Sequence, residues 1–149
     1  MLNSISHDQV WCIHKSKDGT IWAGTDAGLN RIEMDGKEIK SSSHIRIPLL
    51  KDAKVSAITE DTLGNLWLNG IQGLLCYNPK ENTVRQYLSD DGMQSNTFTN
   101  ASVALPGGWV FVGGINGVNF FNPLLFEKNS YKGRPYFTRL KVFNEAIEP

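Results

Sequence analysis

Short apolar runs that alternate with polar residues dominate the pattern of this chain, and glycine, asparagine or aspartate separates one run from the next. Alternation with a period of two predicts β-strands with two unlike faces. No window shows the spacing of apolar residues that an amphipathic helix requires. The first part of the chain contains four predicted strands, Val10–Lys15, Ile21–Thr25, Gly28–Met34 and Ile45–Leu49. The next part contains four more in the same order, Val55–Glu60, Leu66–Gly70, Gly73–Asn78 and Val84–Leu88.

The same pattern returns at a nearly constant period. Trp22 precedes Trp67 by 45 residues, and Trp67 precedes Phe111 by 44 residues. A glycine opens the third strand of each copy with the same spacing, at Gly28, Gly73 and Gly117. Four short strands in a repeat of this length are typical of one blade of a β-propeller. The sequence therefore predicts an all-β fold of about three propeller blades, the last of which lacks a predicted fourth strand.

The recurring residues suit positions within a blade. The large rings at Trp22, Trp67 and Phe111 fall at one register of the second strand, where we expect them to pack between neighbouring blades. Turn residues such as Asp18-Gly19 precede that strand, as tight hairpins require. Further glycines near its end predict a bulge or a close approach of two backbones, at Gly24, Gly70, Gly113 and Gly114.

Composition excludes several classes of protein. The 149 residues include 15 basic and 15 acidic side chains, so no basic patch for nucleic acid is expected. No apolar stretch approaches the roughly 18 residues of a membrane helix, and the first residues do not resemble a signal peptide. We expect a cytosolic chain or a piece of a longer one. Cys12 and Cys76 occupy different positions of the repeat, which favours two small, partly buried thiols over a disulfide.

The motifs of the first copy resemble a known family. Val10-Trp11-Cys12-Ile13, Lys17-Asp18-Gly19, Ile21-Trp22-Ala23-Gly24-Thr25 and Gly28-Leu29-Asn30-Arg31 are similar to the two-component regulator propeller repeat. That repeat builds the sensor regions of hybrid two-component histidine kinases of the Bacteroides type. The second copy departs from the repeat at Asn69, where glycine is usual, and at Gly70, where threonine is usual.

The third copy resembles the closing blade of such a propeller. The segments 91–98 and 112–123 carry this resemblance, and residues 134–144 look like the first strand of the immunoglobulin-like domain that follows. The resemblance implies five segments: a linker or outer strand at 1–9, blades at 10–54 and 55–100, a closing blade at 101–133 and the start of an immunoglobulin-like domain at 134–149.

The resemblance also implies a function. The chain is expected to be a non-catalytic fragment of a periplasmic sensor that detects oligosaccharides and relays binding across the membrane to a kinase. Two alternatives stay open, a propeller that binds proteins and part of a propeller enzyme that degrades polysaccharides. The tail after residue 134 favours the sensor over both.

Motifs for catalysis, metals and cofactors are not found. The three histidines lie 7 and 30 residues apart and the chain has no paired cysteines, so we expect no zinc site and no cofactor. We expect the histidines to be structural or solvated, with His44 in a loop. Asp90-Asp91-Gly92 reads as a turn, and so does Gly113-Gly114-Ile115-Asn116-Gly117 between two strands. Sugar recognition would use exposed aromatic rings and amide hydrogen bonders. The candidate ligand-binding residues are Trp11, Trp109, Tyr87, Asn96 and Asn100.

Three blades cannot close a ring, because propellers have four to eight. We therefore expect this chain to be the C-terminal part of a longer sensor or a truncated reading frame. Its expected partners are an oligosaccharide, the missing blades of the parent propeller and other copies of itself. Open strand edges and uncovered blade faces favour such self-association.

Overall fold

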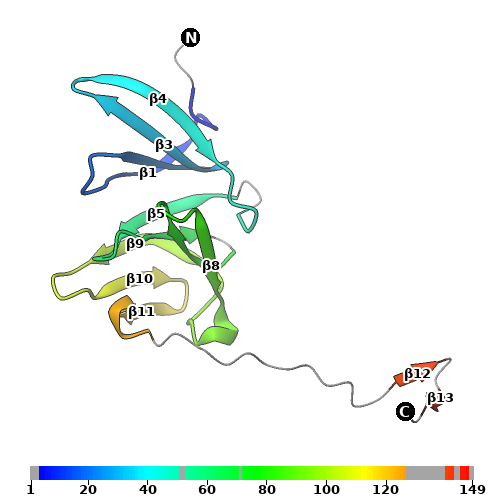
Figure 1. Ribbon diagram of the computed structural model, residues 1–149. Helices are drawn as coiled ribbons and strands as arrows, with labels where there is room; N and C mark the ends of the chain where they lie inside the picture. Colours follow the sequence, from blue (N-terminus) through cyan, green and yellow to red (C-terminus); the bar gives the residue numbers. More distant parts are fainter. Residues whose placement is uncertain (1–3, 51–52, 71, 127–139, 143–144, 148–149) are drawn as a thin grey trace.

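The computed structural model describes residues 4–50, 53–70, 72–126, 140–142 and 145–147. Three antiparallel sheets follow one another along the chain, as Figure 1 shows. The first sheet has the order β1-β2-β3-β4, with strands Val10–Lys15, Ile21–Thr25, Gly28–Asp35 and Glu38–Ile45. The second has the order β5-β6-β7-β8, with strands Val55–Glu60, Leu66–Gly70, Leu74–Asn78 and Thr83–Tyr87.

The third sheet has three strands, β9 (Phe98–Ala104), β10 (Val110–Gly114) and β11 (Gly117–Phe121). Two 3-10 turns, η1 (Ser89–Asp91) and η2 (Pro123–Leu125), flank it in the sequence. β10 and β11 are joined by a tight turn in which Gly114 pairs with Gly117. The all-β prediction is thus confirmed, and residues 101–126 contain no fourth strand in the part that the structure describes.

A short hairpin follows, formed by β12 (Leu140–Val142) and β13 (Glu145–Ile147). β12 lies within the segment that was compared with the first strand of an immunoglobulin-like domain. Residues 134–139 and 143–144 of that segment lie outside the described residues, so the comparison stays a prediction.

One strand prediction was wrong. The fourth strand of the first sheet is Glu38–Ile45, not Ile45–Leu49, and His44 therefore lies in a strand and not in a loop. This outer strand is largely polar and half exposed, so apolar alternation does not mark it. Ile47, one of the apolar residues that suggested a strand, is buried together with Leu50 in the connection to the second sheet.

The core consists of two apolar layers, one between each pair of neighbouring sheets. Trp22 lies in the first layer, where its ring meets the edge of Tyr77 at 6.1 Å between ring centroids. Trp67 lies in the second layer, 4.5 Å from the ring of Phe121. Phe111 occupies the same register but stacks on Phe120, on a face of the third sheet that no described residue of another sheet covers. Two of the three rings therefore pack between blades, as expected.

Both cysteines are free and partly buried between sheets. Burial raises the pKa of the Cys12 thiol to about 11 and that of Cys76 to about 12. The Cys12 thiol donates to the carbonyl oxygen of Val55 at 3.8 Å. Both side chains therefore act as small apolar groups at neutral pH.

Candidate functional site

The edge strands β1, β5 and β9 come together, with β5 between the other two (Figure 1). Ser56 of β5 donates to the carbonyl oxygen of Thr99 in β9 at 3.3 Å, and the hydroxyls of Thr59 and Ser102 also bond across this seam. His14 of β1 meets Glu60 of β5 at 3.0 Å. These side chains fix the three strands at one junction.

A pocket of about 390 Å³ lies at one end of this junction. We call it the junction pocket, because residues of all three sheets line it. Its lining is one tryptophan, one lysine and otherwise small, apolar or neutral polar residues: Trp11, Lys54, Ser56, Gly70, Thr97, Phe98, Thr99 and Asn100.

Two of the candidate ligand-binding residues line the junction pocket. Trp11 is 44% exposed, and its indole N–H donates to Asp26 Oδ1 at 2.7 Å. This bond fixes the orientation of the ring. Asn100 is exposed at the start of β9, and none of the hydrogen bonds of the described residues uses its side chain. An exposed ring and a free amide thus face one space, although 89 residues separate them in the sequence.

The other three candidates lie elsewhere. Asn96 belongs to the loop before β9, where its carbonyl oxygen accepts from Gly73 and its Oδ1 accepts from Ser89. Tyr87 is partly buried beside Trp67, 5.6 Å between ring centroids, and burial raises the pKa of its phenol. Trp109 follows the turn at the far end of β9, away from the junction pocket.

Sequence reasoning missed Lys54, Ser56, Gly70 and residues 97–99 as site residues. One signal was present, because both departures of the second copy from the repeat lie at this place. Gly70 lines the pocket, and a Cβ there would lie 2.8 Å from the carbonyl oxygen of Lys54. Asn69 is buried and its amide donates to the carbonyl oxygens of Thr99 and Ala101, at 2.9 and 3.4 Å. Gly70 therefore allows the backbone of Lys54 to approach the pocket, and Asn69 holds the strand that forms one wall of it.

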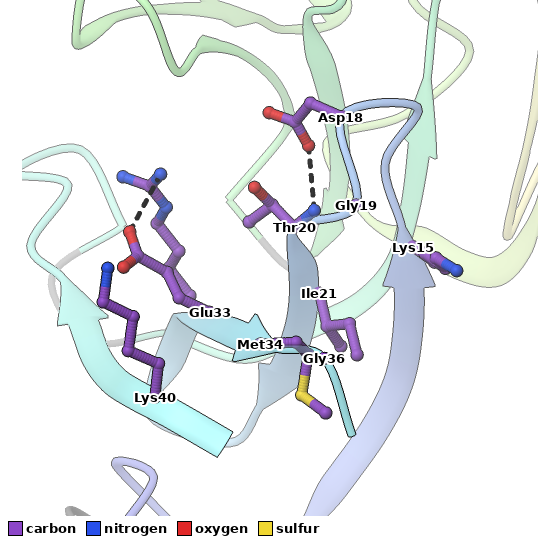
Figure 2. A pocket seen from close by; sticks show the side chains of 10 residues that line it. Lys15, Asp18, Gly19, Thr20, Ile21, Glu33, Met34, Gly36 and Lys40 are labelled. Carbon is purple, nitrogen blue, oxygen red and sulfur yellow. Dashed lines mark hydrogen bonds and ion pairs between the residues drawn. The ribbon is translucent and has the colours of Figure 1, made fainter. Parts of the chain in front are cut away.

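A larger hollow of about 520 Å³ lies on the first sheet, beside the β1–β2 turn (Figure 2). Two of its five charged side chains pair with each other, since the guanidinium of Arg31 meets Glu33 at 3.1 Å. Asp18 accepts from the backbone N–H of Thr20 at 2.9 Å, a bond that lowers the pKa of its carboxyl group. This hollow is formed by one sheet alone and offers no exposed aromatic ring, so we favour the junction pocket as the site.

The described residues contain no cluster of three or more histidine, cysteine, aspartate or glutamate side chains that could hold a metal ion. None of the helical turns in the described part of the chain is long and apolar enough to cross a bilayer.

Comparison with known proteins gives the following relatives. A family model described as "Two component regulator propeller" matches residues 4–27. Histidine kinase P4 of Formosa agariphila is 31% identical over 99 residues, which are 66% of this chain and 7% of that protein.

Two solved structures share the fold. The extracellular domain of a hybrid two-component system from B. thetaiotaomicron has a TM-score of 0.67 and 25% identity, over 76% of this chain and 16% of that one. PorZ, a surface component of the type-IX secretion system of Porphyromonas gingivalis, has a TM-score of 0.68 and 17% identity, over 79% of this chain and 18% of that one. The chain thus spans a small part of each relative. Residues 4–27 thus match the two-component regulator propeller repeat, and the sheets of the chain have the fold of the extracellular two-component domain.

Proposed function

We propose that this chain is a non-catalytic part of the extracytoplasmic, periplasmic sensor region of a hybrid two-component histidine kinase, and that it binds an oligosaccharide in the junction pocket. The kinship with a histidine kinase and with an extracellular two-component domain supports the sensor assignment. The observation that carries the binding site is the meeting of Trp11 and Asn100 in one open pocket.

The chemistry of the pocket suits a sugar. The C–H face of a sugar ring is apolar and packs on an indole, whereas its hydroxyl groups need hydrogen-bond partners. The pocket offers the exposed part of the Trp11 indole, the free amide of Asn100 and serine and threonine residues in its lining. Its described lining holds no carboxylate, whereas glycoside hydrolysis uses a pair of them. Binding is therefore favoured over the alternative of a polysaccharide-degrading enzyme.

The position of the pocket suits a relay. A ligand in it would contact β1, β5 and β9 at once, so its binding energy would favour one arrangement of the three sheets over others. A change in that arrangement is the kind of signal that a following domain can transmit. The relay to a kinase is part of the proposal.

The test is binding of neutral and acidic oligosaccharides to the 149-residue chain, measured by isothermal titration calorimetry. We expect Trp11→Ala and Asn100→Ala each to weaken binding about tenfold, since each removes about 1.4 kcal/mol of contact. Trp109→Ala is the matched control, because Trp109 is similarly exposed, at 39%, but lies outside the pocket.

Unchanged affinity in the Trp11 and Asn100 variants, or an equal loss in the Trp109 variant, would show that the junction pocket is not the site. A chain that binds none of the oligosaccharides would contradict the proposed ligand class.

A further inference from the structure

Lys54 is the one charged side chain among the residues that line the junction pocket. It is half-buried, and the two ion pairs among the described residues are formed by other side chains. The pocket therefore contains a positive charge that no carboxylate of the described chain neutralises at contact distance.

The ammonium group is also held in place. Its nitrogen lies over the ring of Trp11, 3.1 Å from the ring centroid, a cation–π contact. The ring is itself fixed by the bond from its N–H to Asp26. Two successive contacts thus fix the charge at the pocket before any ligand arrives.

The departure from the repeat at Gly70 allows the backbone of Lys54 to lie against the end of β6. At the same register of the first sheet stands Thr25, which is buried and donates to the carbonyl oxygen of Gly28 at 3.2 Å. Gly70 has no side chain, and any Cβ there would press on the backbone of Lys54. The glycine therefore lets the backbone of Lys54 approach the end of β6, and this close approach places the lysine at the pocket.

We propose that the oligosaccharide bound in the junction pocket is acidic, and that Lys54 binds its carboxylate or sulfate group and so selects it over neutral sugars. This inference rests on the proposed function, because it assigns the ligand class of the same site. A neutral sugar would take water from the ammonium group without supplying an opposite charge, which costs free energy. An anion would replace that water with a charge-assisted hydrogen bond, which is about twice as strong as a neutral one.

The experiment uses matched pairs of probes on the 149-residue chain, with affinities from calorimetry. Tetragalacturonate is compared with its methyl ester, and a sulfated carrageenan tetrasaccharide is compared with its desulfated form. We expect at least one acidic probe to bind about tenfold more tightly than its neutral partner. The pair that shows the difference identifies the anion as carboxylate or sulfate. That preference is expected to shrink as salt is added, because salt screens partly exposed charges.

Variants of Lys54 assign the effect. Lys54→Met keeps the aliphatic stem and is expected to remove the preference for the acidic probe while leaving affinity for the neutral probe unchanged. Lys54→Arg keeps the charge and is expected to retain the preference. Lys37→Met is the control, because Lys37 is exposed and lines no part of the junction pocket. Retained neutral binding in Lys54→Met shows that this variant is folded.

The two proposals fail in different ways. Neutral and acidic probes that bind equally, with no effect of Lys54→Met, overturn the selection of an anion and leave oligosaccharide binding intact. A chain that binds no probe, or binds without needing Trp11, overturns the proposed function and this inference with it.

Discussion

The indole N–H groups of the two buried tryptophans are each paired with a side chain six residues earlier. Trp67 donates to Asp61 Oδ2 at 2.9 Å, and Trp22 donates to Ser16 Oγ at 3.0 Å. Asp61 also accepts from the backbone N–H groups of Leu63 and Asn65, at 2.8 and 2.9 Å. One carboxylate thus holds both the β5–β6 turn and the ring that fills the second core layer.

Asp61 accepts from an indole and from the turn, whereas Ser16 accepts from an indole alone. Alanine substitutions at these two equivalent positions are therefore expected to differ in their cost to stability. Asp61→Ala leaves a buried indole N–H and two turn N–H groups without their acceptor, so we expect it to lower the free energy of unfolding by about 3 kcal/mol. Ser16→Ala removes the acceptor of one N–H and is expected to cost about 1 kcal/mol. Urea unfolding followed by tryptophan fluorescence measures both values. Equal losses would show that the carboxylate does not organise the turn.

The third copy shows that the hydrogen-bonding side chain is present only where the ring of the second strand carries an indole N–H. At the register of Asp61 and Ser16 it has Leu105, which is exposed, and Phe111 has no N–H to satisfy. The backbone bonds of the turn are nevertheless kept, since Leu105 donates to Trp109 at 2.8 Å just as Asp61 donates to Asn65 at 3.0 Å. The hairpin is therefore common to all three copies, whereas the side-chain pairing belongs to the covered rings.

At the scale of the element, the second strand of the first sheet packs closely on the first strand of the second sheet. A Cβ at Gly24 would lie 2.7 Å from the carbonyl oxygen of Val55 and 2.5 Å from the Cys12 sulfur. Both β1 and β5 have an irregular register beside this contact. Close backbone approach therefore explains the glycine at this position.

Gly24→Ala is expected to push the first two sheets apart and to lower the free energy of unfolding by about 2 kcal/mol, as overpacking in a core does. Gly36→Ala is the comparison, because Gly36 has φ +62° and open space around it. Its cost is expected to be about 1 kcal/mol, from the left-handed backbone alone. Hydrogen exchange of the Gly24→Ala variant should show faster exchange in β1 and β5; exchange as slow as in the unchanged chain would contradict the close packing.

At the scale of the whole molecule, the third sheet exposes apolar side chains on the face that packs against the next sheet in the first two sheets. Phe120 is 62% exposed and Val118 is 56% exposed, and Phe120 stacks on Phe111 at 5.7 Å. The first sheet likewise exposes Ile13, at 72%. In the first two sheets the equivalent face packs on the next sheet, so this surface has the shape and chemistry of a blade contact.

We therefore predict that the isolated chain self-associates at micromolar concentration. Phe120→Lys is expected to reduce the associated fraction strongly, because it places a charge in the apolar face. Leu63→Lys changes an exposed leucine of the β5–β6 turn and is expected to have no effect. Size-exclusion chromatography with light scattering measures the mass. A monomer of 16.6 kDa for the unchanged chain would show that the prediction is wrong.

The sequence by itself determined the strands and their order. Val10–Lys15, Ile21–Thr25, Val55–Glu60 and Leu66–Gly70 are the strands predicted, because their alternation and their turns are local properties that recur with the period of the repeat. The outer strand Glu38–Ile45 was misplaced, since an edge strand in water needs no apolar residues. The resemblance to the regulator propeller repeat also came from local motifs, and the comparisons confirmed it.

The tertiary structure alone decided where a ligand site can form. The junction pocket joins Trp11 of β1, Lys54 of the connection before β5 and Asn100 of β9, and no spacing along the chain shows that these segments meet. Trp11, Tyr87 and Trp109 were equivalent as sequence candidates, yet one lines the pocket, one packs beside Trp67 and one lies at the opposite end of β9. A repeat fixes each blade through local contacts, whereas a site between blades depends on how the blades pack against each other.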